Sequence, residues 1–310
     1  MEIIRGLHNI RDRHHGCALA IGNFDGVHLG HQALLERLRA QAGACASVPA
    51  VQSFRPTAAA WFDPDNAPPA VLPVRDTARE LAAQGVQRWS CLRFDGRFAR
   101  FAPETYIEEV LVRRLGVVAV IVGADFRFGA QRAGDVAMLR AAGDAYAITG
   151  VESVDDVAVG EGRASSTRLR EHLGAGDLAA AETLLGRRYA LSGVVRSGQR
   201  LGRDLGAATA NLGFRERLAL RHGVYAVRMA CDGAEWPGVA NFGTRPTVGG
   251  DRPRLEAHAL ADTGALYGRQ LTVTFHQFIR AEQRFDSLDA LSRQIRADVE
   301  AARAHFGLSA

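Results

Sequence analysis

The stretch IGNFDGVHLGHQALLERL, residues 21–38, carries two histidines three positions apart, His28 and His31. An apolar run, CALAI, leads into it and a helix-like pattern follows it. The histidines therefore fall where a strand passes into a helix, and their spacing of about one helical turn lets both imidazoles share a face. Such a pair at such a junction indicates either a metal site or a site for phosphate groups.

Two alternatives to phosphate chemistry are a zinc site and an ordinary helix start. Zinc would need further His, Cys or carboxylate ligands. The nearest carboxylate, Asp25, lies in a glycine turn, and the chain has no HExxH motif and no CxxC pair. A single histidine here would be interpreted as a helix cap, but two of them, close to Asn23 and Gly30, favour a ligand.

Phosphate chemistry explains the whole stretch. A helix N-terminus offers unpaired N–H groups and a partial positive charge to an anion. Gly22, Gly26 and Gly30 allow the backbone to approach a ligand closely. Two imidazoles can donate hydrogen bonds to phosphate oxygens as charge builds up in a transition state. If a substrate phosphate attacks the α-phosphorus of a nucleotide, pyrophosphate leaves and no enzyme nucleophile is needed, so the pattern favours nucleotidyl transfer.

Composition limits the classes of protein. The 310 residues suffice for two domains, and 47% apolar with 23% charged residues is typical of a soluble globular chain. No run of 18 apolar residues predicts a membrane span, and the N-terminus lacks the apolar core of a signal peptide, so we expect a cytoplasmic protein. The four cysteines are far apart and predict reduced thiols rather than a metal or redox motif.

The basic residues exclude several enzyme mechanisms. All 38 of them are arginine, which excludes a P-loop lysine, a Schiff-base lysine and the strand lysine of protein kinases. The net charge is only +4 and the arginines are scattered, so we expect neither a nucleic-acid partner nor a membrane surface.

The first part of the chain, residues 1–185, alternates strand-like and helix-like segments. Strands are predicted at 18–21, 48–54, 89–94 and 117–122, and helices at 31–40, 76–84, 103–115 and 135–142. This rhythm predicts a doubly wound parallel α/β domain with helices on both faces of the sheet. Ligands of such sheets bind beyond the carboxyl ends of the strands, which is where residues 22–31 lie.

The second part, residues 186–310, has a different pattern. Short strand-like segments separated by glycine turns run from Tyr189 to about residue 279, and a helical pattern follows from Ser287 to Phe306. We expect a small antiparallel β-barrel domain with a C-terminal helix, for which Ser287 is the N-cap.

Six motifs, in order along nearly the whole chain, carry a family resemblance. They are GNFDGVHLGH (22–31), GADFRFG (123–129), SSTRLR (165–170), GRDLGAATANL (202–212), GVANFGTRPT (238–247) and LEAH (255–258). With these motifs the sequence resembles the prokaryotic bifunctional riboflavin kinase/FAD synthetases, whose N-terminal half belongs to the HxGH nucleotidyltransferases.

The resemblance implies that the domain at 1–185 adenylylates FMN, so that FMN and ATP give FAD and pyrophosphate. It implies a catalytic role for His28 and His31 as the clamp on the triphosphate. The residues it implies for binding are Gly22, Asn23, Phe24, Asp25, Gly30, Asp125, Phe126, Arg127, Ser165, Ser166, Thr167 and Arg168. Core packing is an alternative for Phe126 and is preferred for Phe128. A simple helix cap followed by a solvated arginine is an alternative for SSTR.

The resemblance also implies that the domain at 186–310 phosphorylates riboflavin, so that riboflavin and ATP give FMN and ADP. Gly202 and Arg203 would belong to a phosphate-cradling loop. Thr209 and Asn211 would hold Mg²⁺ and ATP through hard neutral oxygens. Glu256 would be the catalytic base that accepts the proton of the ribityl hydroxyl. Its alternation with apolar neighbours equally fits an outward-facing strand residue with no chemical role.

Two departures from the family pattern stand out. Arg55 and Ala58 replace a glutamate and a proline in the loop after the second strand, and Ala207-Ala208 replace Phe-Pro before Thr209. Loss of the stiffening proline predicts a weaker or slower kinase.

Alternative functions are therefore an adenylyltransferase with a weakened or inactive kinase module and a catalytically silent flavin- or nucleotide-binding regulator. The expected partners are riboflavin, FMN and ATP, and weak self-association is left open.

Overall fold

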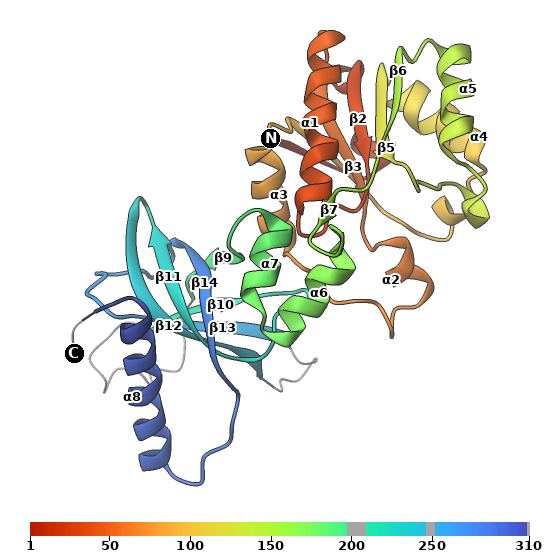
Figure 1. The fold of residues 1–310 in the computed structure, drawn as a ribbon. Helices are drawn as coiled ribbons and strands as arrows, with labels where there is room; N and C mark the ends of the chain where they lie inside the picture. The colour runs from red at the N-terminus through yellow and green to blue at the C-terminus, as the bar shows by residue number, and fades with distance from the viewer. Residues whose placement is uncertain (197–208, 246–251, 309–310) are drawn as a thin grey trace. The chain divides into compact units, whose positions relative to one another are not determined.

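The computed structural model describes residues 1–196, 209–245 and 252–308. The chain forms two compact units (Figure 1). The first comprises Met1–Pro68 and Thr77–Ser165, and the second comprises Pro69–Asp76 and Ser166–Ala310. The division expected from the motifs, between residues 185 and 186, differs from the boundary of these compact units and stays a prediction.

The first unit is built on a six-stranded sheet in which every neighbouring pair is parallel. Its strands, in spatial order, are β1 (Glu2–Arg5), β4 (Arg88–Leu92), β3 (Val48–Phe54), β2 (Cys17–Ile21), β5 (Ala119–Gly123) and β6 (Gly150–Val154). The chain moves from β2 to β3 and β4 on one side, then returns to β5 and β6 on the other. The strand order therefore reverses between β2 and β5, and ligands of open α/β sheets bind beyond the carboxyl ends at such a point.

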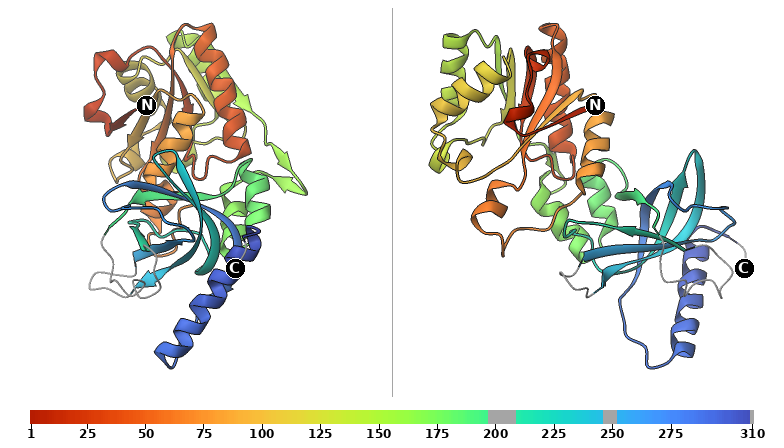
Figure 2. Two further views of the ribbon diagram at one scale, coloured as in Figure 1. Left: turned by 90° about the vertical axis from the view of Figure 1, so that its left-hand side faces the viewer. Right: turned by 180° about the vertical axis from the view of Figure 1, so that it is seen from behind.

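Helices cover both faces of this sheet (Figures 1 and 2). The helix α1 packs against β2 and β5. On the opposite face, Leu19, Ile21 and Val120 lie in one core cluster with Tyr106, Leu111 and Leu139. The helices of the first unit are α1 (Leu29–Ala44), α2 (Ala58–Phe62), α4 (Pro103–Thr105) continued by a π-helix (Tyr106–Arg114), and α5 (Val136–Tyr146), with α3 (Val74–Ala83) beginning in the second unit. The predicted doubly wound parallel fold is confirmed.

The second unit is a nearly closed antiparallel barrel. Its strands, in spatial order, are β10 (Thr209–Gly213), β13 (Arg252–Ala259), β12 (Ala234–Arg245), β11 (Gly223–Cys231), β14 (Gln270–Ala281) and β9 (Ala190–Val194). A bridge between Arg196 and Asn211 brings the two ends of the sheet together. The helices are α6 (Ser166–Ala175), α7 (Leu178–Leu185) and α8 (Leu288–His305), which starts at its N-cap Ser287 as expected. The predicted barrel with a C-terminal helix is confirmed.

Alternation along the strands separates the inside of the barrel from the outside. Leu212, Leu255 and Phe242 are fully or almost fully buried and point inward. Outward residues of β11 and β12, such as Val224, Ala226 and Val239, form a second cluster with Ala302 of α8. The outer face of the barrel is therefore partly covered by α8, which runs beside the strands (Figure 1).

The segment Pro69–Asp76, which we call the strap, belongs to the second unit although the chain on both sides belongs to the first. Its Ala70 exchanges backbone hydrogen bonds with Arg217 and Ala219 (2.8 and 2.9 Å). The fully buried carboxylate of Asp76 accepts hydrogen bonds from the N–H (2.9 Å) and the hydroxyl (2.5 Å) of Ser192. The strap is thus an integral part of the barrel unit.

Candidate functional sites

The two histidines of the first motif lie stacked on each other at the start of α1. Their ring centroids are 3.7 Å apart with an interplanar angle of 21°. His28 is the N-cap residue, and its Nδ1 accepts a hydrogen bond from the backbone N–H of His31 (3.4 Å). The ring of Phe24 also packs against His31, with centroids 5.2 Å apart. The motif places both imidazoles at the positive end of a 16-residue helix, beside β5.

Burial keeps His31 neutral. Desolvation, reinforced by the nearby His28, holds the pKa of His31 well below its ordinary value of 6.5. Its Nδ1 is buried and, within the part of the chain that the structure describes, has no hydrogen-bond partner. A neutral imidazole with a buried and unsatisfied nitrogen is costly unless a ligand completes it. The pair therefore has the character of a binding site.

The turn that precedes the histidines is strained. Phe24 and Val27 adopt positive φ angles of 52° and 45°, which cost side-chain-bearing residues about 1–2 kcal/mol each. A Cβ on Gly30 would lie 3.2 Å from the ring of His28 and 3.3 Å from the carbonyl of Ala164, so the turn is closely packed. Such strain is typical of a site that must hold a fixed shape.

Other turn residues serve the fold as much as a ligand. The N–H of Gly22 donates to Gln52 (3.1 Å) and so extends the ladder between β2 and β3. Asn23 is exposed, Asp25 is half-buried and Phe24 is buried. Phe24 therefore packs beside the ring of His31 and presents no surface to solvent.

The second motif follows β5 and lies on the other side of the switch point. Asp125 is exposed and forms an ion pair with Arg163 (3.4 Å). Arg127 forms another with Asp135 (3.4 Å). Phe126 is half-buried and stacks on Phe128, with centroids 5.7 Å apart. Phe128 is buried, in agreement with the expectation of core packing.

An aromatic cluster, which the sequence analysis did not single out, lies at the same edge of the sheet. Successive rings contact one another with centroids 5.0–6.0 Å apart. Its members are Phe54, Phe62, Phe94, Phe98, Phe101, Tyr106, Phe126 and Phe128. Phe62 at the end of α2 is 70% exposed, so the cluster opens to solvent there. The available signal was the repeated phenylalanines at or just beyond the ends of three predicted strands, 48–54, 89–94 and 117–122.

The third motif lies at the start of α6. Ser165 immediately precedes the helix, and Ser166, Thr167 and Arg168 occupy its first turn. The boundary between the two compact units falls between Ser165 and Ser166. Within the first unit, the carbonyl of Ala164 lies close to Gly30, and Ser165 is the next residue of the chain.

In the barrel, two of the predicted kinase residues face each other. Asn211 of β10 lies directly opposite Glu256 of β13, and Asn241 of β12 lies opposite Glu256 on its other side. The three side chains therefore form a row across adjacent strands, with neighbouring Cβ atoms about 4.5–5.5 Å apart. Leu255 and Ala257 point into the barrel, so the row lies on its outer face.

The surroundings of the row are polar. Asn211 is buried, and Arg254 approaches the carboxylate of Glu256 to 3.6 Å. Thr209, two residues before Asn211, is exposed on the same outer face. Gly202 and Arg203, like Ala207 and Ala208, lie outside the described residues.

A divalent cation fits this donor set. The hydroxyl of Thr209 and the amide oxygen of Asn211 are hard neutral oxygens on one face of one strand. No group of three or more His, Cys, Asp or Glu residues in the described ranges could hold a metal ion alone. A cation here would therefore take the rest of its ligands from substrate phosphates and water.

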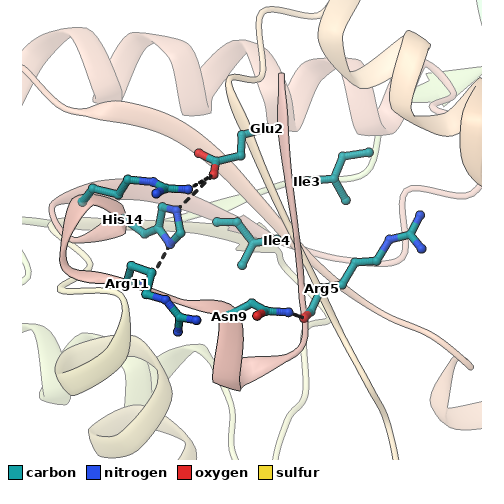
Figure 3. Close-up of a pocket in the computed structure, with 8 residues that line it drawn as sticks. Glu2, Ile3, Ile4, Arg5, Asn9, Arg11 and His14 are labelled. Carbon is teal, nitrogen blue, oxygen red and sulfur yellow. Dashed lines mark hydrogen bonds and ion pairs between the residues drawn. The ribbon is translucent and has the colours of Figure 1, made fainter.

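A hollow of about 380 Å³ lies at the edge strand β1 (Figure 3). Two basic side chains surround its Glu2, which accepts from Arg13 (2.7 Å) and lies 3.2 Å from Nε2 of His14. Nδ1 of His14 accepts from the backbone of Arg11 (2.9 Å). None of the predicted site residues lines it, and its internal pairing fits a structural role.

None of the described helices combines the length and apolar character needed to cross a membrane. The cytoplasmic location expected from the sequence stays a prediction.

Comparison with known proteins covers both halves of the chain. A family model described as FAD synthetase matches residues 10–168, and one described as riboflavin kinase matches residues 185–306. A protein from Pseudomonas fluorescens is 46% identical over 305 residues, which cover 98% of this chain and 97% of that protein. One from Escherichia coli (strain K12) is 45% identical over 312 residues, 100% and 99% of the two chains. Both bear the name bifunctional riboflavin kinase/FMN adenylyltransferase.

A solved structure from Streptococcus pneumoniae, that of a protein named as a macrolide-efflux protein, shares the fold along nearly the whole chain. It has a TM-score of 0.78 at 26% identity and covers 98% of this chain and 99% of its own. The full-length identities and the two family models agree with the family that the six motifs predict. The chain belongs to the family of bifunctional riboflavin kinase/FMN adenylyltransferases.

Proposed function

We propose that this chain makes FAD from riboflavin in two ATP-dependent steps. The barrel phosphorylates riboflavin to FMN with release of ADP, and the α/β unit adenylylates FMN to FAD with release of pyrophosphate. The observation that carries this proposal is the presence of two separate polar sites on two folds, the His28–His31 stack and the Asn211–Glu256 pair.

In the adenylyl transfer, a phosphate oxygen of FMN attacks the α-phosphorus of ATP. The new O–P bond forms as the bond from the α-phosphorus to the bridging oxygen breaks, and that oxygen leaves with pyrophosphate. His28 and His31 donate hydrogen bonds to the phosphate oxygens, where donors that are already in place stabilise developing charge. The unsatisfied Nδ1 of His31 supports this role. Ser165, Ser166, Thr167 and Arg168 are proposed for the leaving pyrophosphate on the motif alone, as hydroxyls at a helix start followed by a guanidinium fork.

The aromatic cluster binds the flavin ring in this proposal. It lies beyond the carboxyl ends of β3, β4 and β5, beside the switch point that holds the histidines. A planar isoalloxazine can stack on an accessible aromatic ring, and the exposed Phe62 and the half-buried Phe126 are the candidates for such a contact. In this proposal Asp125 and Arg127 bind polar groups of the flavin or of the nucleotide.

In the kinase step, the terminal ribityl hydroxyl attacks the γ-phosphorus of ATP, and its proton passes to Glu256. The bond from the γ-phosphorus to the bridging oxygen breaks and ADP leaves. Thr209 and Asn211 bind the nucleotide together with Mg²⁺, which supplies charge neutralisation at the phosphates. Gly202 and Arg203 are proposed for the same nucleotide on the motif alone. The absence of lysine agrees with this proposal, since arginines, backbone N–H groups and the cation can balance the negative charge of the nucleotide phosphates.

A chromatographic time course tests both steps. Purified protein is incubated with riboflavin, excess ATP and Mg²⁺, and a parallel sample receives FMN and ATP. We expect FMN to form first and FAD to follow. Conversion of FMN alone would retain the adenylyltransferase and reject the kinase. Binding of flavin and ATP without any turnover would replace the proposal with a regulatory binding protein. Parallel runs with Mn²⁺ or Ca²⁺ in place of Mg²⁺ test the identity of the cation.

A further inference from the structure

We propose that Asn241 is a specificity residue of the kinase site, which binds a secondary hydroxyl of the polyol chain, and that Glu282 is the positioning residue that orients it. This inference rests on the proposed kinase function of the barrel. It assigns roles to two residues outside the set expected from the sequence.

The position of Asn241 follows from the strand register. It lies directly opposite Glu256 on β12, as Asn211 does on β10. It is exposed, whereas Asn211 is buried. A hydroxyl held at Glu256 would therefore have the Asn241 amide about one cross-strand spacing away, on the side opposite to the residues proposed for the nucleotide.

The orientation of the Asn241 amide is set by Glu282. The Nδ2 group of Asn241 donates to Oε1 of Glu282 (3.5 Å), and an ionised carboxylate can only accept. This turns Nδ2 toward Glu282 and leaves the acceptor Oδ1 on the other side of the amide. An acceptor is what a substrate hydroxyl needs when it offers its O–H group.

Two features determine where Glu282 lies. One is the glycine at position 243 of β12, and the other is the end of β14, which an ion pair fixes to α8. A Cβ on Gly243 would overlap the Glu282 carboxylate, so this close approach to β12 requires glycine. Two residues earlier, Arg280 donates to both carboxylate oxygens of Asp298 in α8 (2.8 and 2.7 Å). His222 lies 3.9 Å from the other oxygen of Glu282. The carboxylate therefore has room beside β12 because of Gly243, and it lies close to both Asn241 and His222.

The chemical consequence concerns the kind of substrate. A ribityl chain carries several adjacent hydroxyls, and only the terminal one reacts. An oriented acceptor beside the base binds a neighbouring hydroxyl and so fixes which carbon presents its oxygen to the γ-phosphate. The site therefore selects a polyol chain over a simple alcohol, since loss of one hydroxyl leaves Oδ1 without its partner.

The test compares Asn241→Ala and Glu282→Gln with Glu235→Gln. Glu235 is an exposed residue on the same strand, six positions from Asn241, and gives the same charge change as Glu282→Gln. Kinase kcat and KM are measured for riboflavin and for ATP. The probe is a riboflavin analogue without the ribityl hydroxyl next to the reacting carbon. FMN adenylylation by the same preparations monitors the first unit, and hydrogen–deuterium exchange of β12 and β13 confirms the folding of the barrel.

We expect the KM for riboflavin to rise about 3- to 10-fold in Asn241→Ala, the size of one lost hydrogen bond, with the KM for ATP unchanged. Wild type should discriminate against the deoxy analogue by a similar factor, and Asn241→Ala should not discriminate. Glu282→Gln should show a smaller rise in the KM for riboflavin, because its amide can pair with either end of Asn241.

The inference would be overturned if Asn241→Ala and wild type discriminated equally between riboflavin and the deoxy analogue. It would also be overturned if Glu282→Gln and Glu235→Gln had the same KM for riboflavin. A wild-type protein that lacks kinase activity would be a different result, because it rejects the proposed kinase function itself.

Discussion

The imidazole of His28 caps the helix on which His31 stands, because its Nδ1 accepts a hydrogen bond from the backbone N–H of His31 (3.4 Å). One histidine therefore has two roles, a structural one at the helix start and a proposed chemical one toward phosphate. Suitable substitutions can separate them.

We expect His28→Asn to keep the cap, since asparagine is a preferred N-cap residue, while removing the imidazole donor. Adenylyl transfer should fall about 100- to 1,000-fold, as for the loss of one preorganised donor. Riboflavin phosphorylation should be unchanged and serves as the internal control. His28→Ala should show the same loss of activity together with a destabilisation of about 1 kcal/mol. Wild-type adenylyl transfer in His28→Asn would show that the ring is only a cap.

Phe62→Ala tests the aromatic cluster as a flavin platform. The ring is 70% exposed, so its removal should cost the fold little, whereas the KM for FMN in adenylyl transfer should rise about 3- to 10-fold. The matched control is Tyr267→Ala, an aromatic that is 61% exposed in the other unit. An unchanged KM for FMN in Phe62→Ala would remove this residue from the site.

The barrel unit should lose stability in mild acid through His276. Arg188 donates to Nδ1 of His276 (2.5 Å), and burial with the nearby Arg188, His305 and Arg228 lowers the pKa of His276 to about 4 from 6.5. Between these two pH values the unfolded chain binds a proton that the folded chain does not. The free energy of unfolding therefore falls as the pH drops from 6.5 toward 4 and is fully retained above 6.5.

Urea unfolding of His276→Gln at several pH values checks this expectation. Glutamine can still accept from Arg188 and does not titrate, so the decline in the free energy of unfolding across this window should be shallower. The control His8→Gln replaces an exposed histidine in the first unit. Equal slopes for His276→Gln and wild type would contradict the assignment.

The ion pair between Arg280 and Asp298 should contribute more to the free energy of unfolding than the exposed pair between Arg269 and Asp232. Asp298 is buried and also accepts from Gln294 (3.0 Å). Asp298→Ala leaves the guanidinium without its two acceptors and should destabilise α8 by about 2–4 kcal/mol. Arg269→Ala, which breaks the exposed pair with Asp232, should cost less than about 1 kcal/mol. Hydrogen exchange of the α8 amides measures the first effect, and equal effects of the two variants would argue against it.

Asp76→Ala tests the strap. The substitution leaves the N–H and the hydroxyl of the buried Ser192 without the carboxylate that they contact, which should cost about 2–3 kcal/mol. The kinase should lose activity at a lower temperature than in wild type. Asp63→Ala, at the exposed end of α2, is the control. An unaltered inactivation temperature for Asp76→Ala would show that the contact between Asp76 and Ser192 contributes nothing to the stability of the barrel.

Local patterns predicted much of the fold and part of the site. Apolar runs gave β2, β3, β4 and β5, and the amphipathic pattern gave α8 from its N-cap onward. The short strands β1, β6 and β10 were not identified, because segments such as GVESV and TANLG contain too few apolar residues to rise above a loop.

What the sequence could not show depends on long-range register. Asn241 stands in a recognised motif, but only the pairing of β12 with β13 places it opposite Glu256. The Pro-rich stretch at residues 63–73, which includes much of the strap, is typical of a loop, and nothing local reveals its contacts because Ser192 and Arg217 lie more than a hundred residues away. The aromatic cluster was missed for the same reason, since its rings come from segments that lie far apart in the chain.

The strap has a consequence for how such a protein can be inherited. Because residues 69–76 complete the barrel unit, the kinase body is not encoded by one continuous stretch of gene. A recombination event that exchanged only the last 125 codons would replace Ser192 but not Asp76. The new barrel would then pack against a strap from a different protein. The two catalytic bodies are thus expected to diverge together, as one unit of descent, even where their chemistries are independent.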